Sequence, residues 1–364
     1  MRFRYGIEHE LAILRDGVYA DFTDLTFDEL QSVVDALPFD AADYPDLRVG
    51  DQGIKRKRWY VEGYERFDDQ GDLVRCDPKG LEVRTRIHGS VDAAVGALAA
   101  DVDLMNAELG RHGLATCAIG FNPLRTAYVI DPPLGEWERA HRIGSPEERT
   151  AHLHMVTYGP DLNLSADGLD VLDAARKLTH YSPWLVPLSF SSPFREGKPW
   201  GGLSARTSMR TGARPAAMAF LGPDAEQVAS DPSLTQLARL PAEIGRLEFK
   251  AFDAIGDLAL YGELLSLLTG LVLDDTLPGR RTTPDAAAHR HVATVGLTDD
   301  AVHAGTGALL TAAEHALADR PADLARLAAL RRRWDRRESA ASAMLAAYAA
   351  GATLTEVIAA SAPR

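Results

Sequence analysis

The chain has 364 residues, of which 46% are hydrophobic and 25% charged, and its formal net charge is −13 at pH 7. A chain of this length and composition can bury a sizeable core, and it has no apolar run of the roughly 18 residues that a membrane helix needs. The acidic balance argues against a nucleic-acid partner, because phosphate backbones are bound by concentrated basic surfaces.

Two further features concern the cellular compartment. Acidic residues interrupt the first apolar run, which a secretory signal does not tolerate, so we expect a cytoplasmic protein without a membrane partner. Cys76 and Cys117 are the only cysteines, so the sequence holds neither a disulfide framework nor a CxxC metal pair.

The first 90 residues are expected to form mainly antiparallel strands. Polar and apolar residues alternate in residues 2–14, 57–67, 72–77 and 80–87. Residues 23–37 between the first two strands form a short helix, with Thr26 as its N-cap. The pattern is typical of a sheet with one polar face.

Helices become more frequent further along the chain. A helix opens at Ser90 and stops near Gly113, and a second one over residues 167–190 is interrupted near Pro183. Residues 114–121, 152–158 and 245–254 are expected as strands, and residues 191–210 as a loop rich in Gly, Ser and Arg.

The last third of the chain is expected to be almost wholly helical. Helices are predicted over residues 257–275, 301–319, 322–349 and 353–360, with an exposed loop over 277–297. Since no repeat or linker intervenes, we predict a single integrated α+β domain over residues 1–364. It is mainly sheet-forming with helical insertions over 1–256 and mainly helical over 257–364.

Charged side chains with a period of two mark the candidate site. Glu8 and Glu10 share one face of the first strand, and two carboxylates so close favour a cation between them, such as the Mg²⁺ that bridges nucleotide phosphates. An isolated E-x-E pair is more often a solvated strand face. However, two other predicted strands carry such rows as well, with Glu82, Arg84 and Arg86 on one and Arg246, Glu248 and Lys250 on the other. Because surface ion pairs contribute only about 0 to 1 kcal/mol each, a cation-filled, phosphate-binding sheet explains these rows better.

His152 and His154 also lie two residues apart on a predicted strand. An H-x-H pair can bind zinc, but zinc prefers a third nitrogen or sulfur ligand and the remaining candidates are carboxylates. Taken alone, this pair fits ordinary core or surface histidines better.

Five segments, taken in order, resemble the landmarks of the glutamate-cysteine ligase family, in particular its bacterial carboxylate-amine ligase branch, family 2. They are GIEHEL at 6–11, LEVRT at 81–85, HLH at 152–154, PLSFSSPFREGKPWGGLSARTSMR at 187–210 and GRLEFKAFDA at 245–254. The resemblance implies a fold of the glutamine synthetase and guanidino kinase type, in which a curved antiparallel sheet forms a funnel backed by helices.

The resemblance also implies an activity and its partners. The expected enzyme is an ATP-dependent ligase that forms an amide bond between a small-molecule carboxylate and an amine through an acyl phosphate, with two or three Mg²⁺ ions, or with Mn²⁺ in their place. The expected carboxylate donor is glutamate or another amino acid, and the expected acceptor is an amino acid or amine. A peptide substrate stays open, and so does assembly into a homo-oligomer. The alternatives are a phosphotransferase that makes an acyl or guanidino phosphate and a non-catalytic nucleotide-binding homologue.

Carried over by position, the resemblance assigns roles to individual residues. The expected metal ligands are Glu8, Glu10, Asp77, Glu82, His152 and Glu248. The expected catalytic residues are Arg206, Glu82 and Glu248. Arg206, Lys250 and Arg290 are expected to bind the nucleotide, and Arg84 and Arg86 a substrate carboxylate.

The chain departs from the family pattern at two places that bear on the substrate. Lys250 stands where the family often has Arg, which replaces a planar fork by a point charge. The segment between the Asn122-Pro123 turn and His152 is short and lacks the usual Tyr- and Arg-rich run. Since loops often determine substrate choice, glutamate and cysteine are not assumed as the substrates.

Overall fold

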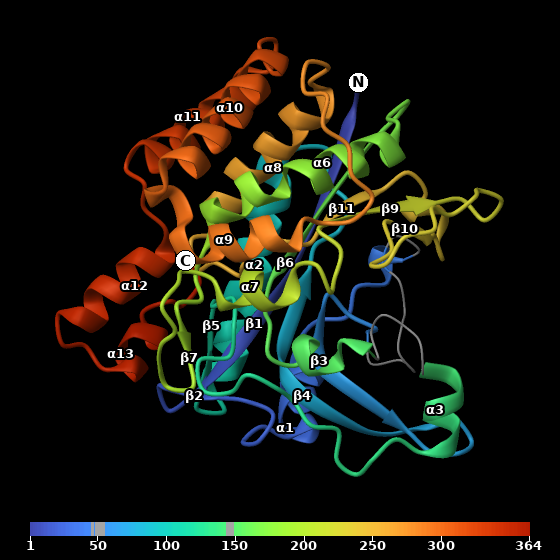
Figure 1. Cartoon of the computed structure of the whole chain (residues 1–364). Coiled ribbons are helices and arrows are strands. Elements are labelled where there is room, and N and C mark those ends of the chain that lie inside the picture. Colours follow the sequence, from blue (N-terminus) through green and yellow to red (C-terminus); the bar gives the residue numbers. More distant parts are fainter. Residues whose placement is uncertain (45–46, 48–54, 143–148) are drawn as a thin grey trace.

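The computed structural model describes residues 1–44, 47, 55–142 and 149–364. Within these residues, one curled sheet runs through the centre of the molecule in the order β10-β9-β11-β6-β1-β4-β3, and β2 and β5 pair with the far end of β1 (Figure 1). All neighbours are antiparallel except β9 and β10. The strands of this sheet are β1 (Phe3–Arg15), β2 (Val18–Ala20), β3 (Trp59–Phe67), β4 (Leu73–Arg84), β5 (Leu114–Cys117), β6 (Pro160–Ala166), β9 (Ala217–Leu221), β10 (Thr235–Leu237) and β11 (Leu247–Phe249). A separate hairpin joins β7 (Phe194–Arg195) to β8 (Lys198–Pro199).

Strand β1 lies in the middle of the sheet, and its two faces differ in chemistry. Tyr5, Ile7 and Leu11 are buried on the face that helices cover, whereas Glu8 and Glu10 lie on the other face and are partly exposed. Because side chains alternate along a strand, this pattern places every second residue of β1 toward the open side of the sheet.

Helices cover the apolar face of the sheet. Those packed against it or against one another are α1 (Phe27–Ala36), α2 (Val91–Gly110), α6 (Val171–Leu185), α8 (Ala259–Leu273), α10 (Asp300–Ala316) and α11 (Pro321–Asp335). Helix α8 is buried along most of its length because it lies between the sheet, α2 and the outer helices α10 and α11 (Figure 1). The predicted α+β class, with a curved antiparallel sheet backed by helices, is therefore confirmed.

The remaining helices lie at the ends and edges of the sheet. They are α3 (Glu136–Arg142), α5 (Ala151–His154), α7 (Ala205–Arg210), α9 (Ala286–Val295), α12 (Ala340–Ala349) and α13 (Leu354–Ala359). Short 3-10 turns are η1 (Ala41–Asp43), η3 (Val186–Ser189), η4 (Pro241–Glu243) and η5 (Gly296–Thr298). Among the described helices, none combines the length and apolar character that crossing a bilayer requires.

Several local predictions are confirmed with their physical cause. Thr26 caps α1 by accepting a hydrogen bond from the Glu29 amide, and Ser90 caps α2 by accepting one from Ala93. Pro183 lies inside α6. The helix ends two residues later, at Leu185, and the chain continues directly as the 3-10 turn η3.

Five predictions were wrong. The predicted loop at 191–210 contains the hairpin of β7 and β8 and the helix α7. Residues 72–77 and 80–87 do not form two strands, because β4 continues from one segment into the other. The predicted loop at 277–297 contains α9, whose His289, Val292 and Ala293 are buried. Residues 322–349 form two helices, α11 and α12, with Arg337 in the left-handed region (φ 55°) between them. Residues 151–154 form the helical turn α5, so the predicted strand at 152–158 is absent from this part of the described chain.

Strands β6, β9 and β10 were not predicted. The omission of β6 matters most, because β6 lies beside β1 along seven residue pairs from Phe3 to His9. Its alternation was nevertheless visible: Leu162 and Leu164 are buried, and Asp161, Asn163 and Ser165 are on the other face.

Candidate functional site

Carboxylates from five strands gather on the open face of the sheet. They are Glu8 and Glu10 of β1, Glu62 of β3, Glu82 of β4, Asp161 of β6 and Glu248 of β11. The strand register brings them together: Glu10 lies opposite Glu82, and Glu8 lies between Arg84 on one side and Asp161 on the other. Neighbouring positions across antiparallel strands are about 4.5 to 5.5 Å apart, so these acids act on one another electrostatically.

Glu82 is the carboxylate of this group that a bound cation would stabilise most. Its side chain is 6% exposed, and among the described residues no hydrogen bond or ion pair reaches its carboxylate. Burial, and then the charges of Glu62, Glu10 and Glu8, raise the pKa of Glu82 well above its ordinary value. A divalent cation placed here would relieve both effects, and hard cations of this kind prefer oxygen ligands.

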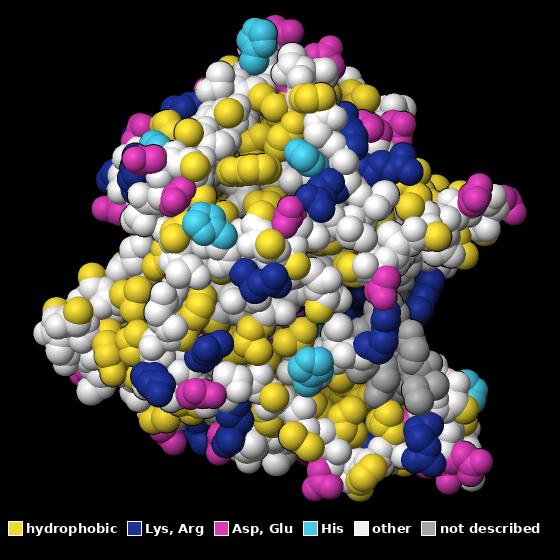
Figure 2. All heavy atoms as spheres, in the orientation of Figure 1, with side chains coloured by type: hydrophobic (Ala, Val, Ile, Leu, Met, Phe, Trp, Pro, Cys, Tyr) yellow, Lys and Arg dark blue, Asp and Glu magenta, His cyan; other side chains and the backbone are white. Residues whose placement is uncertain are grey.

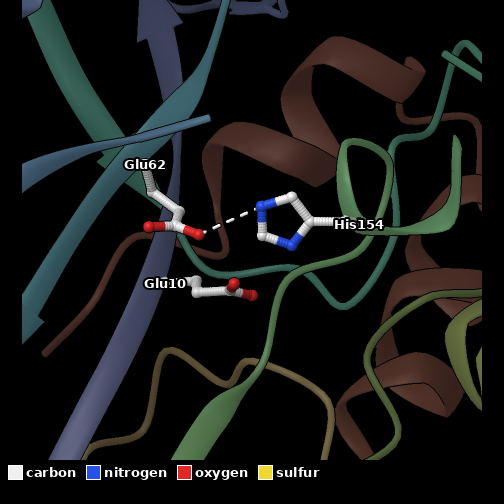
Figure 3. A group of neighbouring side chains, drawn as sticks. All are labelled: Glu10, Glu62 and His154. Atoms are coloured by element: carbon white, nitrogen blue, oxygen red, sulfur yellow. Dashed lines mark ion pairs between the residues drawn. The ribbon is translucent and has the colours of Figure 1, made fainter. Parts of the chain in front are cut away.

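Glu10, Glu62 and His154 form the tightest group of metal-ligating atoms in the described chain. One ligand atom from each lies within 4.8 Å of the others. In Figure 3 the His154 ring faces the Glu62 carboxylate, at 3.1 Å from Nε2 to Oε1, and the Glu10 carboxylate lies below them. Although burial alone would raise it, Lys55 and His154 lower the pKa of Glu62 well below its ordinary value, so this acid is ionised.

His154, and not His152, is the histidine of the site. The predicted strand would have placed both rings on one face, but residues two apart in a helix point to nearly opposite sides. His152 is accordingly exposed on α5, whereas His154 lies at the wall of the cavity beside Glu62. The expectation that His152 is a metal ligand is corrected in this way.

This pair of histidines supplies a matched test. We expect His154→Ala to raise the concentration of Mg²⁺ or Mn²⁺ needed for half-maximal phosphate release from ATP about tenfold or more, because one of the three candidate ligands is lost. His152→Ala removes an exposed imidazole ring from the same helical turn and is expected to leave that concentration unchanged. Metal titrations of both variants check this, and equal shifts would remove His154 from the site.

Lys79 was not predicted, yet it is the most deeply buried cation of the site. It is 1% exposed, and its ammonium group lies 2.7 Å from Glu10 Oε1. It also donates hydrogen bonds to the carbonyl oxygens of His154 (3.0 Å) and Thr157 (2.9 Å). Lys79 therefore ties Glu10 of β1 to the segment that carries His154.

A second basic group surrounds the acid of β11. Lys250 contacts Asp161 and lies 2.5 Å from Glu248, and Arg246 lies 3.2 Å from Glu248 and 3.4 Å from Glu8. The predicted row of Arg246, Glu248 and Lys250 on one face is confirmed. Burial lowers the pKa of Lys250, but Asp161 and Glu248 overcome this and raise it above its ordinary value, so Lys250 stays charged.

Arg206 is held next to the acids by the backbone. It is 3% exposed and donates to the carbonyl oxygens of Ala251 (3.0 Å) and Lys250 (2.9 Å). Its helix α7 begins at Ser204, whose hydroxyl donates to the buried carboxylate of Asp253 and accepts from the Thr207 amide. The Ser-rich segment predicted from the sequence therefore serves to position Arg206.

Glycine at position 159 lets Arg206 approach the acids. A Cβ atom at this residue would lie 2.2 Å from Arg206 Nη2, which is too close for any side chain. The Gly159 amide itself donates to Glu10 Oε2 at 2.8 Å. Arg206 and Glu10 are thus in contact with the same glycine.

The site opens into two adjoining cavities. The larger, of about 530 Å³, contains Glu10, Glu62, Glu82, His154 and Arg206 in its wall. The smaller, of about 230 Å³, is lined by Arg84, Arg86, Arg246 and Glu248, and both include Glu8, Asp161 and Lys250. The larger cavity also reaches Trp137 of α3 and Gln236 of β10. Figure 2 shows a hollow between the part of the molecule that carries α3 and the part that carries β10, with Lys and Arg side chains gathered there.

Most predicted site residues line these two cavities. Asp77 and Arg290, like His152, lie outside them. Those that line the cavities are Glu8, Glu10, Glu82, Arg84, Arg86, Arg206, Glu248 and Lys250. Asp77 is bound instead by Arg75 (Nη2 to Oδ2, 2.7 Å) and by the Tyr128 hydroxyl, outside both cavities. Arg290 is exposed on α9, away from them. These two positions do not fit the expected metal and nucleotide roles.

Sequence reasoning missed residues whose neighbours in the chain give no sign of the site. Glu62 lies in a segment that was read only as a strand, and Lys79 next to a proline in β4. Asp161 belongs to the unpredicted strand β6, where it lies opposite Glu8 of β1. The alternating D-L-N of residues 161–163 was the available signal.

The site can be compared with known proteins. The family model described as glutamate-cysteine ligase family 2 matches residues 4–360 of the chain. The structure is similar to a glutamate-cysteine ligase from Francisella tularensis in complex with AMP, with 13% identity, a TM-score of 0.58, and coverage of 99% of this chain and 87% of that one. It is also similar to a bifunctional glutathione synthetase from Pasteurella multocida, with 12% identity and a TM-score of 0.60. Coverage is 99% of this chain and 51% of that one, so this chain spans about half its length. At these identities the two likenesses establish the fold. No curated protein matches the chain.

Proposed function

The chain belongs to the glutamate-cysteine ligase family 2, a family of ATP-dependent carboxylate-amine ligases, and on this premise we propose that it joins a carboxylate to an amine through an acyl phosphate. The observation that carries the proposal is the buried carboxylate of Glu82, which lies among five other acids and has no hydrogen-bond or ion-pair partner in the described chain. Such a group of acids favours bound cations, and Mg²⁺ bound to nucleotide phosphates is the cation that this class of reaction uses.

The proposed roles follow from the geometry of the two cavities. Glu8, Glu10, Glu82 and Glu248, together with Glu62 and His154, would hold two or three Mg²⁺ or Mn²⁺ ions, which neutralise the charge of the transferred phosphoryl group. Arg206, next to Glu10 across Gly159, would bind the γ-phosphate through its planar donors. Lys250 would contribute a point charge to the same group.

The proposed reaction has two steps. An oxygen of the substrate carboxylate attacks the γ-phosphorus of ATP, the bond to the β-phosphate oxygen breaks, and ADP leaves. The amine nitrogen then attacks the acyl carbon, loses a proton, and displaces inorganic phosphate as the C–N bond forms. Arg84 and Arg86, at the wall of the smaller cavity, would hold a carboxylate of the substrate.

Glutamate, through its γ-carboxylate, is the proposed donor, with another amino acid as the alternative, and an amino acid, amine or peptide is the proposed acceptor. Phosphate release is to be measured with ATP and Mg²⁺ over a panel of carboxylates and amines. We expect release that requires both organic substrates, in amounts equal to the amide formed. Release with a carboxylate alone that no amine accelerates would favour a kinase, and nucleotide binding without release for any pair would contradict the ligase.

A further inference from the structure

Three arginines of one short segment line the larger cavity. Arg206 and Arg210 are four residues apart on α7, and Arg214 follows after four more. Residues four apart lie on the same side of a helix, about 6 Å along its axis, which places Arg206 and Arg210 side by side. After α7 the chain turns at Thr211 and Gly212 (φ 104°), and the Arg214 amide donates to the Arg210 carbonyl oxygen at 3.0 Å, which closes the turn.

None of these three guanidinium groups forms an ion pair within the described chain. Arg206 donates to two backbone carbonyls, Arg210 to the Pro215 carbonyl oxygen (3.2 Å) and Arg214 to the Thr150 hydroxyl (3.0 Å). A guanidinium has five N–H donors, so most donors of Arg210 and Arg214 remain for another partner.

Burial makes this arrangement unfavourable without a further anion. Arg206 and Arg210 are 3% and 5% exposed. Burial, and then the neighbouring charges of Arg206 and Arg214, lower the pKa of Arg210 well below its ordinary value. Other buried cations of the site differ in this respect, since Lys79 contacts Glu10 and Lys250 contacts Asp161 and Glu248.

The row also has a direction. Arg206 shares Gly159 with Glu10 and therefore adjoins the acids of the reaction centre, whereas Arg214 lies against Thr150 at the start of α5. Arg210, between them in the chain, is near enough to Asp161 for its charge to help lower the pKa of that acid. A group bound by Arg210 and Arg214 would therefore lie beside the reaction centre.

We propose that Arg210 and Arg214 form a second oxyanion site, which holds an anionic group of the bound substrates that does not itself react. This inference rests on the proposed function for the reaction centre. The shared chemistry is an oxyanion that accepts from planar guanidinium donors, and a non-reacting carboxylate of an amino dicarboxylic acid or a phosphate of the nucleotide could supply it. Because Arg206 and Lys250 are already assigned to the transferred phosphoryl group, the carboxylate is the source that we expect.

Calorimetric titration of the full chain in the presence of Mg²⁺ distinguishes a substrate carboxylate from a nucleotide phosphate as the bound group. The probes are L-glutamate, L-aspartate and their α-amides, each in the presence of a non-hydrolysable ATP analogue, and in a second series ADP and inorganic triphosphate. We expect Arg210→Met and Arg214→Met to weaken binding of the dicarboxylates about tenfold or more, and to leave the α-amides and ADP unchanged. Weaker binding of ADP and triphosphate alone would keep the oxyanion site and assign it to the nucleotide.

Unchanged affinity for every probe in both variants would overturn the inference. Arg214 is only partly buried, so the Arg214 variant remains informative if the Arg210 variant does not fold. Arg210→Lys is expected to retain part of the binding, because lysine keeps the positive charge but lacks the planar guanidinium. Arg336→Met, at an exposed position far along the chain, is the control. Binding that depends on Arg210 without any turnover would contradict the proposed function alone, and turnover that is indifferent to both variants would contradict this site alone.

Discussion

Glu8→Gln and Glu248→Gln are expected to reduce substrate-dependent phosphate release at least about 100-fold. Each change removes one negative charge and keeps the shape of the side chain. Glu8 lies between Arg84 and Asp161 in the centre of the sheet, and Glu248 is held by Arg246 and Lys250. Without the charge, a bound metal ion would lose a ligand, and the two basic residues around Glu248 would lose a partner.

The measurement is the rate of phosphate release at saturating ATP, repeated over a range of Mg²⁺ concentrations. Glu226→Gln, an exposed acid in the loop between β9 and β10, is the matched control and is expected to retain the wild-type rate. If either active-site variant kept more than about a tenth of the wild-type rate at every Mg²⁺ concentration, its residue would not be a metal ligand.

Lys79→Met is expected to lower the free energy of unfolding by about 3 kcal/mol and to reduce activity as well. Methionine fills a similar volume, so the loss comes from charge and hydrogen bonding rather than from a void. Glu10 would lose its ammonium partner, and the carbonyl oxygens of His154 and Thr157 would each lose a donor. The Glu10 side chain is 18% exposed, which places the effect at the lower end of the range for a broken buried ion pair.

Urea denaturation with and without Mg²⁺ checks this prediction. Because a cation that binds the folded state stabilises it, saturating Mg²⁺ is expected to recover part of the loss by neutralising Glu10 in place of Lys79. Lys198→Met, at an exposed position of β8, is expected to leave the urea midpoint unchanged. An unaltered midpoint in Lys79→Met would show that Lys79 does not hold Glu10 and the His154 segment together.

The sequence by itself determined the elements whose signals are local. Alternation over residues 2–14 predicted β1, and with it the common face of Glu8 and Glu10. Thr26 and Ser90 marked the starts of α1 and α2, because a capping side chain acts on amides only two or three residues away. The ordered motifs located Glu82, Arg206, Glu248 and Lys250 because each lies within a segment whose own pattern is distinctive.

Only the tertiary structure decided which other residues join them. Strand pairing over more than 150 residues of chain puts Asp161 beside Glu8, and pairing of β3 with β4 puts Glu62 near Glu82. Because residues 151–154 form a helical turn, His154 rather than His152 lies beside Glu62. This depends on packing against β3 and not on the sequence H-L-H itself. Likewise, nothing local distinguishes Asp77, which Arg75 and Tyr128 bind, from the acids of the site. Periodicity fixes the face of a residue within its own element, whereas the partner across that face is set by long-range register, which the local sequence does not encode.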